Sequence, residues 1–420
     1  MSRLNQELGL LQGIGLLSTS LLGTGIFVVP ALAATAAGEV SLWAWLILIG
    51  LVLPVAFTFA QLGRHYPHAG GAPHLIGRAF GTRMERLIAF LFLAVLPVGL
   101  PAALSIATGF WQALFPMNGG AVLAVQFATL GAILLLGQRP ARASGLVQGL
   151  IAIAIVASVA LVWWVGDLPL ASQPLLPPVS GSWHLLPAAL GVMFWCFVGI
   201  EAFTHLGEEF KRPQRDFPLA LLLGVLLAGL VYWACSVAVL SFATYGDVRT
   251  DATALPRLFD LLLGDKARWL VATVGYLACF ASMNVYIQGF ARLIWSLADE
   301  GKLPAPLAVR NGHGVPARAL VVVVLSCALC AAIAALLDLS VDHLIRYANG
   351  NFVVIYLLSM AAGWVLLRGV WRWLAALSTL LCALVLVALG GDAVYALGLL
   401  AVLALLDWWR APKARAAMEP

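Results

Sequence analysis

Two side chains that bind and transfer protons, Glu201 and His205, lie four residues apart in the apolar stretch "LGVMFWCFVGIEAFTHLGEEF". That spacing places both on one face of a helix. A carboxylate inside a membrane costs several kcal/mol and is retained for pairing, proton transfer or ligand binding. We therefore predict that Glu201 gates or couples a process by changing protonation, with His205 as its relay. A structural carboxylate bonded to a neighbouring helix is the alternative.

Glycines interrupt this stretch and one other. Gly199 precedes Glu201, and Gly23 and Gly25 flank Thr24 in "LLGTGIFVVP". Unwinding a helix in a membrane is tolerated only where protein, water or a ligand satisfies the exposed backbone groups. Close packing of helices is the other common use of glycine in membranes. Because the interruptions come as a pair and one adjoins a carboxylate, they favour a binding site.

The backbone groups at the two breaks would suit one class of ligand. The amides around Thr24 to Ile26 start the second half of their helix, where the positive end of the dipole would hold a carboxylate. The carbonyls of residues 196–198 end the first half of the other helix and would accept hydrogen bonds from an ammonium group. A cavity between these walls fits an amino acid.

The elements that must position these groups are membrane helices. Of the 420 residues, 62% are hydrophobic and 10% charged, which is typical of membrane proteins and not of soluble globular ones. We predict an all-α membrane protein whose twelve apolar stretches are each long enough to span a bilayer: 8–37, 41–63, 87–115, 121–137, 145–165, 184–206, 219–243, 267–296, 318–337, 341–366, 371–389 and 391–409.

The basic residues predict the orientation. With both termini in the cytoplasm, most of the 24 Lys and Arg residues fall on the inner side, as the positive-inside rule requires. The outer side receives only Arg249, Arg257, Lys266 and Arg268. The net charge of +5 follows from this bias and indicates no nucleic-acid partner.

Gly23 and Gly199 lie five predicted helices apart, which is the spacing expected of an inverted five-helix repeat with its binding site at the midplane. We predict a single transmembrane domain over 1–420. It would contain a first repeat at 8–165, a second at 184–366, and two added helices at 371–409.

Other polar residues are given ordinary roles. His65, His68 and His74 lie in the first inner loop, but their irregular spacing and lack of an acidic partner favour loop histidines over a metal site. Arg292, near the inner end of its helix, is expected to extend its charge into the interface. No metal-ligand set, nucleophile elbow or dinucleotide loop is found, so neither an enzyme nor a cofactor is predicted.

Four segments resemble motifs of the amino acid–polyamine–organocation (APC) superfamily of transporters. They are "GTGIFVVP", "HYPHAGGAPHLIGRAFG", "FWCFVGIEAFTHLGEEFKRPQRDFPLAL" and "ADEGKLP", in order over about 300 residues. The resemblance implies a LeuT/APC-like fold with discontinuous helices 1 and 6. It assigns the substrate carboxylate to Gly23, Thr24 and Gly25, the amino group to Phe197, Val198 and Gly199, aromatic contacts to Trp195 and Tyr286, and a nearby polar group to Asn284.

Within that superfamily, the segments around both breaks look most like bacterial exporters of methionine and branched-chain amino acids. This resemblance implies a secondary active exporter in the inner membrane that acts by alternating access, driven by protons or exchange. The expected substrates are methionine, leucine, isoleucine and valine. An importer or exchanger of the same fold is one alternative, and a non-transporting amino acid sensor or channel is another. Oligomeric state leaves no signature in the sequence.

Overall fold

The structure is a computed structural model that describes residues 4–23, 25–168, 182–246, 254–264 and 267–416. Thr24, a predicted carboxylate donor, lies outside the described residues, and so does the side chain of Trp195. The described residues form helices and no β-strand. A single parallel bridge joins Leu8 to Phe210.

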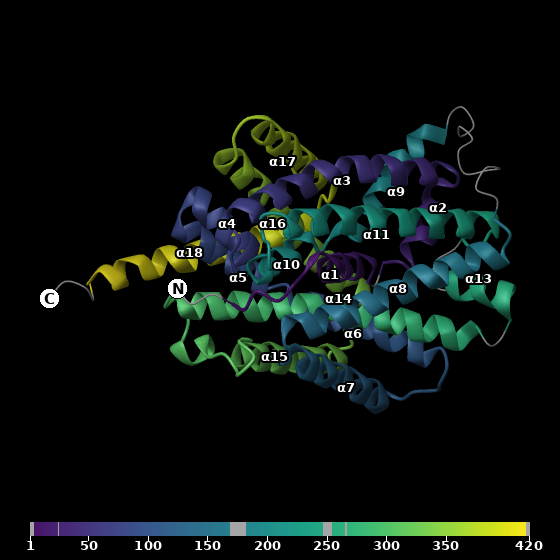
Figure 1. Ribbon diagram of the computed structural model, residues 1–420, viewed down its shortest axis with the longest axis horizontal. Helices are drawn as coiled ribbons and strands as arrows, with labels where there is room; N and C mark the ends of the chain where they lie inside the picture. Colours follow the sequence, from purple (N-terminus) through teal and green to yellow (C-terminus); the bar gives the residue numbers. More distant parts are fainter. Residues whose placement is uncertain (1–3, 24, 169–181, 247–253, 265–266, 417–420) are drawn as a thin grey trace.

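The helices form one elongated bundle (Figure 1). In chain order they are α1 (Leu10–Leu22), α2 (Val29–Ala37), α3 (Val40–His65), α4 (Gly71–Phe80), α5 (Thr82–Leu93), α6 (Leu96–Gln112), α7 (Gly119–Gly137), α8 (Ala141–Val165), η1 (Ser182–Leu185), α9 (Leu186–Met193), η2 (Phe194–Phe197), α10 (Ile200–Phe203), η3 (Thr204–Glu209), α11 (Asp216–Ser241), α13 (Ala254–Leu263), α14 (Ala267–Asp299), η4 (Ala305–Ala308), α15 (Ala317–Leu336), α16 (Val341–Leu366), α17 (Val370–Ala388) and α18 (Asp392–Ala416).

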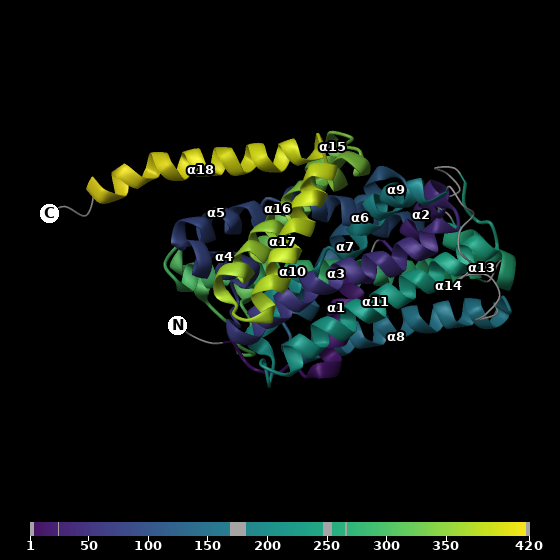
Figure 2. The same ribbon diagram turned by 90° about the horizontal axis from the view of Figure 1, so that it is seen from above.

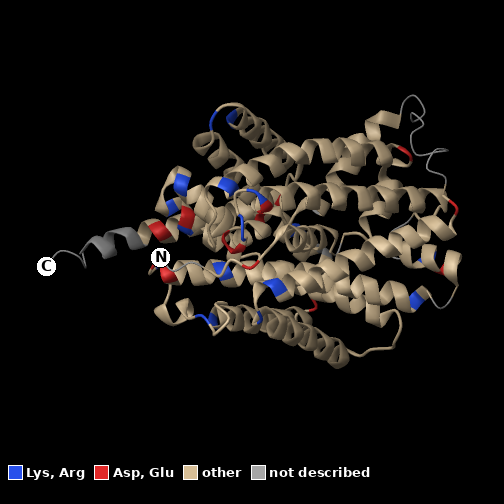
Figure 3. Ribbon diagram, in the orientation of Figure 1, with Lys and Arg blue, Asp and Glu red and all other residues tan. Residues whose placement is uncertain are grey.

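Among the described residues, ten helical segments are long and apolar enough to cross a membrane: α3, α5 with α6, α7, α8, α11, α14, α15, α16, α17 and most of α18. The all-helical membrane class predicted from composition is therefore confirmed. Both termini lie at the same end of the bundle, here called the N-terminal end (Figure 1). Lys and Arg gather mainly in that half (Figure 3).

Two further apolar segments are broken where the glycines predict. The first is α1 followed by α2, separated by residues 23–28, and the second is α9 followed by η2, α10 and η3. Gly199 has a φ of +134°, a conformation that side chains other than glycine rarely adopt. Both interruptions are thus present at Gly23 and Gly199.

Small residues let α1 lie deep in the bundle, where it contacts α8, α11 and α14. A Cβ on Gly15 would come within 2.8 Å of the Gly149 backbone, and one on Gly224 within 3.0 Å of Leu17. Close approach of this kind replaces hydrophobic driving force in helix packing within membranes. The first break is thereby placed at the centre of the molecule.

The N-terminal end is closed by polar contacts. The Glu209 carbonyl accepts hydrogen bonds from the amides of Glu7 and Leu8, each at 2.9 Å. The Glu209 carboxylate pairs with both Nε and Nη2 of Arg292. Arg292 is only 2% exposed, so the prediction that it extends toward the interface is wrong. The reason is that a buried carboxylate on η3, distant in sequence, supplies the partner its charge needs.

The last helix leaves the bundle. α18 runs past the other elements toward the C-terminus (Figure 2). Asp407 on α18 pairs with Arg83, at 2.8 Å, and with Arg86 of α5. These ion pairs hold α18 to the N-terminal end of the bundle.

Candidate functional site

Among its described residues, the first break leaves one predicted amide donor available. Gly23 donates to the Thr19 carbonyl at 3.0 Å, and Ile26 donates to the Leu22 carbonyl at 3.1 Å. Gly25 makes no backbone hydrogen bond as a donor to any described residue. The Tyr232 hydroxyl on α11 donates to the carbonyls of Leu21, at 2.9 Å, and Leu22, at 3.3 Å. The break is thus stabilised on its carbonyl side, while the Gly25 amide remains for a ligand.

The second break is stabilised by another tyrosine. The Tyr356 hydroxyl on α16 donates to the Phe197 carbonyl at 2.9 Å and accepts from the Ile200 amide at 3.2 Å. The Gly199 amide donates to Oε2 of Glu201 at 2.9 Å. The Val198 carbonyl accepts no hydrogen bond from a described residue. The Gly199 carbonyl accepts from the Phe203 amide at 3.2 Å, so Val198 is the one left open among Phe197, Val198 and Gly199.

A cavity of about 60 Å³ lies between the two breaks. Its wall contains the predicted residues Gly25, Val198 and Tyr286. Phe197, Gly199, Gly23, Ile26 and Asn284 are not part of it. The remaining wall is formed by Ser20, Leu21, Val95, Gly99, Leu100, Ala103, Ser282, Met283 and Phe352.

The sequence analysis missed the α6 side of this cavity and the serines. The Ser20 hydroxyl is buried and has no partner among the described residues. The Ser282 hydroxyl donates to the Ser20 carbonyl at 3.1 Å. An unpaired buried hydroxyl beside the Gly25 amide is a second donor for a carboxylate. Its position three residues before Gly23 was the only signal in the sequence.

Glu201 lies just behind the cavity and is fully buried. Its Oε1 accepts a hydrogen bond from the Tyr286 hydroxyl at 2.8 Å, and its Oε2 accepts the Gly199 amide. Because Tyr286 lines the cavity, one hydroxyl connects the ligand space to the carboxylate. His205 is not joined to Glu201 by a hydrogen bond in the described part of the chain. Its Nδ1 instead donates to the Ala69 carbonyl at 2.9 Å.

Asn284 belongs to a separate polar network. Its Nδ2 donates to the Ser144 hydroxyl at 2.9 Å, and its Oδ1 accepts from Gln288 at 2.9 Å. Nearby, Gln148 of α8 accepts from the Thr19 hydroxyl and donates to the Ala281 carbonyl at 2.9 Å. The uncharged Gln148 side chain therefore connects α8 to both α1 and α14 by hydrogen bonds. Asn284 therefore serves helix packing on the face of α14 away from the cavity.

A larger cavity of about 870 Å³ shares Gly25 with the smaller one. Its wall includes residues of α2, α9 and the C-terminal part of α17. Of these elements, α2 and α9 lie in the half of the bundle away from the N-terminal end (Figure 1). The larger cavity therefore extends from the small one toward α2 and α9, whereas the polar contacts of Glu209 and Arg292 lie at the N-terminal end.

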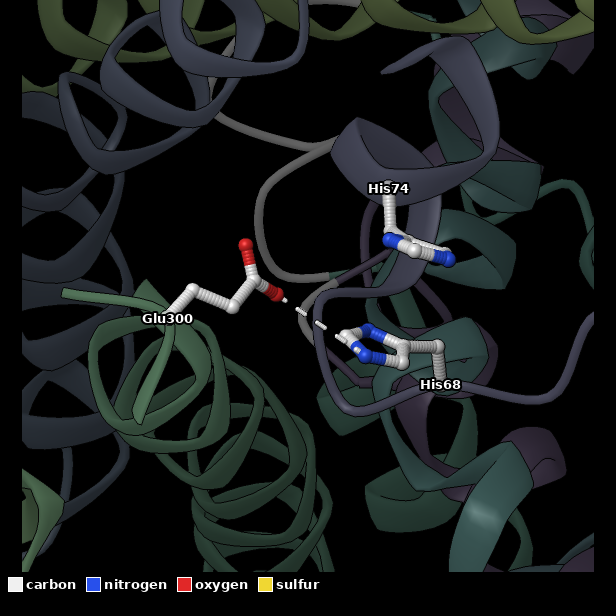
Figure 4. Close-up of side chains that lie close together, drawn as sticks. All are labelled: His68, His74 and Glu300. Carbon is white, nitrogen blue, oxygen red and sulfur yellow. Dashed lines mark ion pairs between the residues drawn. The ribbon is translucent and has the colours of Figure 1, made fainter. Parts of the chain in front are cut away.

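Two of the loop histidines meet an acidic residue that the sequence analysis could not place beside them. His68, His74 and Glu300 offer ligand atoms within 4.8 Å of one another (Figure 4). The two imidazole rings are stacked at 3.7 Å with an angle of 18° between them. Lone pairs of parallel rings do not converge on one ion, and the Lys302 ammonium already pairs with Glu300. This arrangement suits an ion-pair cluster better than a metal site.

Comparison with known proteins identifies the family. The model of the family described as amino acid permease matches residues 8–406. The L-methionine/branched-chain amino acid exporter YjeH of Escherichia coli (strain K12) is 52% identical over 406 residues, which cover 97% of each chain. The uncharacterized amino acid permease YecA of Bacillus subtilis (strain 168) is 26% identical over 92% of this chain and 91% of its own. A cadaverine/lysine antiporter of E. coli (strain K12) is 25% identical over 75% of this chain and 72% of its own. The resemblance drawn from the motifs is confirmed, and the chain belongs to the amino acid permease family of the APC superfamily.

Proposed function

We propose that the protein is a secondary exporter of neutral, apolar L-amino acids, with methionine, leucine, isoleucine and valine as substrates. The observation that carries this proposal is the small cavity between the broken helices. The Gly25 amide and Ser20 hydroxyl would hold the carboxylate, and the Val198 carbonyl would hold the ammonium group. The identity to an exporter of these amino acids supports the substrate class and direction.

The chemistry of the remaining wall favours an uncharged side chain. Leu100, Met283 and Phe352 are apolar, and no acidic side chain among the described residues lines the cavity. A lysine or cadaverine ammonium group would be desolvated there without a partner, which costs several kcal/mol. This separates the proposed substrates from those in the name of the cadaverine/lysine antiporter.

For the architecture, we propose twelve crossings, namely the ten unbroken segments and the two broken helices. The paired breaks support two inverted repeats, at 8–165 and 184–366, within one domain, with 371–409 added. The gathering of Lys and Arg at the N-terminal end supports cytoplasmic termini in a bacterial inner membrane. In this orientation the contacts of Glu209 and Arg292 would close the cytoplasmic side, and the part of the larger cavity lined by α2 and α9 would face outward.

For energy coupling, we propose that Glu201 carries the proton. As a carboxylate it accepts hydrogen bonds from Tyr286 and Gly199 at the same time. Protonation would remove the charge that strengthens both bonds and would add an O–H donor that needs an acceptor. Because Tyr286 lines the cavity and Gly199 forms the break, proton binding would alter both the ligand space and the hinge.

The test is the release of preloaded radiolabelled methionine from cells or vesicles, with and without a proton gradient. We expect faster release than in cells lacking the protein, competition by leucine but not lysine, and loss of the effect when the gradient collapses. Glu201→Gln should keep substrate exchange but remove its dependence on pH. Unchanged methionine release would contradict the substrate or the direction, and an unchanged pH dependence in Glu201→Gln would contradict the coupling role.

Saturable counterflow distinguishes the alternatives. A carrier with an alternating-access site accelerates uptake of labelled substrate when unlabelled substrate is on the other side. An importer would accumulate methionine under the same gradient. A channel or a non-transporting sensor would show no such acceleration.

A further inference from the structure

The loop that connects α3 to α4 is fixed at the N-terminal end from two sides. On one side, η3 holds Ala69, whose amide donates to Glu208 at 3.2 Å and whose carbonyl accepts from His205. On the other side, the end of α14 approaches through Glu300, whose Oε1 lies 3.8 Å from Nε2 of His68. The loop therefore bridges the second broken helix and α14, between which the cytoplasmic path would open.

Lys302 neutralises the cluster beside this loop. Its ammonium group pairs with Glu300 and, at 2.8 Å, with Glu85 of α5. Glu85 also accepts a hydrogen bond from His74 Nδ1 at 3.2 Å. Although burial opposes it, hydrogen bonding to Glu300 and Glu85 raises the pKa of Lys302 above its ordinary value. Two carboxylates, one ammonium group and two imidazoles thus meet in one place. Figure 4 shows the two imidazoles and the Glu300 carboxylate.

The His68 ring has a defined tautomer in this arrangement. The Gly70 amide donates to Nδ1 of His68 at 3.0 Å, so Nδ1 carries no hydrogen. The neutral ring must then carry its hydrogen on Nε2, which faces Glu300. A second proton can be added only at Nδ1, where it would meet the Gly70 N–H. Protonation of His68 therefore breaks a hydrogen bond inside the loop itself.

We propose that His68 and its neighbours His74, Glu85, Glu300 and Lys302 form a proton-sensitive latch, in which proton uptake at His68 Nδ1 releases the loop and unlocks the N-terminal end. Loss of the bond from Gly70 frees the turn that contains Ala69 and Gly71. Gly71 has a φ of +55°, and a Cβ there would overlap the His205 ring. The turn therefore packs directly against the His205 ring, so a change in the turn would be transmitted to η3.

The surroundings of His68 oppose its protonated form while the latch is closed. Burial first, and the adjacent His74 second, lower the pKa of His68 from its ordinary 6.5 to about 4, while Glu300 and Glu85 oppose this only in part. The groups that face it are His74 from α4, Glu85 from α5, and Glu300 and Lys302 beyond the end of α14. Glu208 and His205 act on the next residue, from η3.

The direction of the pH effect follows from that lowered pKa. A released loop would expose His68 to water and restore an ordinary pKa, so protons bind the released state more tightly. The latch is at full strength above about pH 6.5 and weakens as the pH falls toward 4. Between pH 7.5 and 5.0, the ratio of released to latched protein should rise about 30-fold.

The experiment measures the latch without substrate. Spin labels at Phe80→Cys on α4 and Ala305→Cys on η4 would report the distance across it by double electron–electron resonance, in nanodiscs at pH 7.5 and 5.0. Cys330→Ala removes the one cysteine that is not buried. We expect a longer distance to appear at pH 5.0. In His68→Asn the side-chain oxygen can still accept the Gly70 amide in an Asx turn but takes up no proton, so the distance should stay short at both pH values.

His65→Asn is the matched control, because His65 ends α3 directly before the loop and lies outside the cluster, with its Nδ1 on the Gln61 carbonyl. It should keep the pH response. The proposal is overturned if wild type shows no response, if His68→Asn keeps it, or if only added Zn²⁺ changes the distance. The inference rests on the proposed transport function only for naming this end the cytoplasmic gate, and a failure of transport would leave the distance measurement unaffected.

Discussion

The hydroxyl of Tyr286 donates a hydrogen bond to Oε1 of Glu201 across 2.8 Å, joining α14 to the second half of a broken helix. The tyrosine ring lines the small cavity, whereas the carboxylate is fully buried behind it. A ligand in the cavity would touch the ring and thereby act on the carboxylate. Substrate binding and proton binding can be coupled through this one bond.

Removing the Tyr286 hydroxyl should uncouple substrate binding from proton binding. In Tyr286→Phe the ring still forms the cavity wall, but Glu201 loses a donor worth roughly 1.5–3 kcal/mol to a charged acceptor. We expect methionine affinity to change by less than about threefold, and the proton-driven rate to fall about tenfold with an altered pH profile. Counterflow and gradient-driven release at several pH values would measure both.

Tyr276→Phe is the control for that change. Tyr276 lies on the same helix, and its hydroxyl bonds to Thr129 of α7 at 2.7 Å, outside the cavity wall. It should leave the pH profile as in the wild type. Equal effects of the two substitutions would mean that the hydroxyls matter only for helix packing.

The size of the cavity should be set by Gly99 of α6. A Cβ at this position would lie 3.0 Å from Val95 and 3.7 Å from Ala348, so a larger side chain must project into the space of about 60 Å³. Gly99→Val should weaken methionine and leucine transport roughly tenfold or more, and affect alanine less. Gly109→Val adds the same side chain to the same helix where no atom lies within 4 Å. It should transport all three substrates normally, and a uniform loss in Gly99→Val would argue against a role in selectivity.

The sequence predicted the two helix breaks but not the side chains that form hydrogen bonds with their exposed backbone groups. Glycines at 23 and 199 mark unwinding because unwinding depends on local backbone freedom. The partners of the exposed carbonyls, Tyr232 and Tyr356, come from helices far along the chain, and nothing in the local pattern distinguishes them from other membrane tyrosines. Glu300 beside His68 was missed for the same reason. Pairing between distant helices depends on packing, which one sequence does not reveal.

Tyr232 should stabilise the fold as well as the break. Tyr232→Phe would leave the buried carbonyls of Leu21 and Leu22 without its hydroxyl, at a cost of about 1–3 kcal/mol. The ring can still stack on Trp45, whose centroid is 4.9 Å away. We expect a lower midpoint of thermal unfolding in detergent. Tyr347→Phe, at a site 41% exposed, should leave the midpoint unchanged, and equal stability of the two variants would contradict this role for Tyr232.

The pair formed by Arg292 and Glu209 should show the largest stability effect. Both side chains are buried, at 2% and 6% exposure, so removing either charge leaves the other without the opposite charge it pairs with. Arg292→Met and Glu209→Gln should each destabilise by roughly 3–5 kcal/mol, and the double variant by less than the sum of both. The exposed pair of Arg268 and Asp260, at 3.3 Å, is the comparison, and Arg268→Gln should cost at most about 1 kcal/mol. Denaturation of the four variants would give the coupling energy. Additive effects of the two buried substitutions would show that the two charges do not depend on each other.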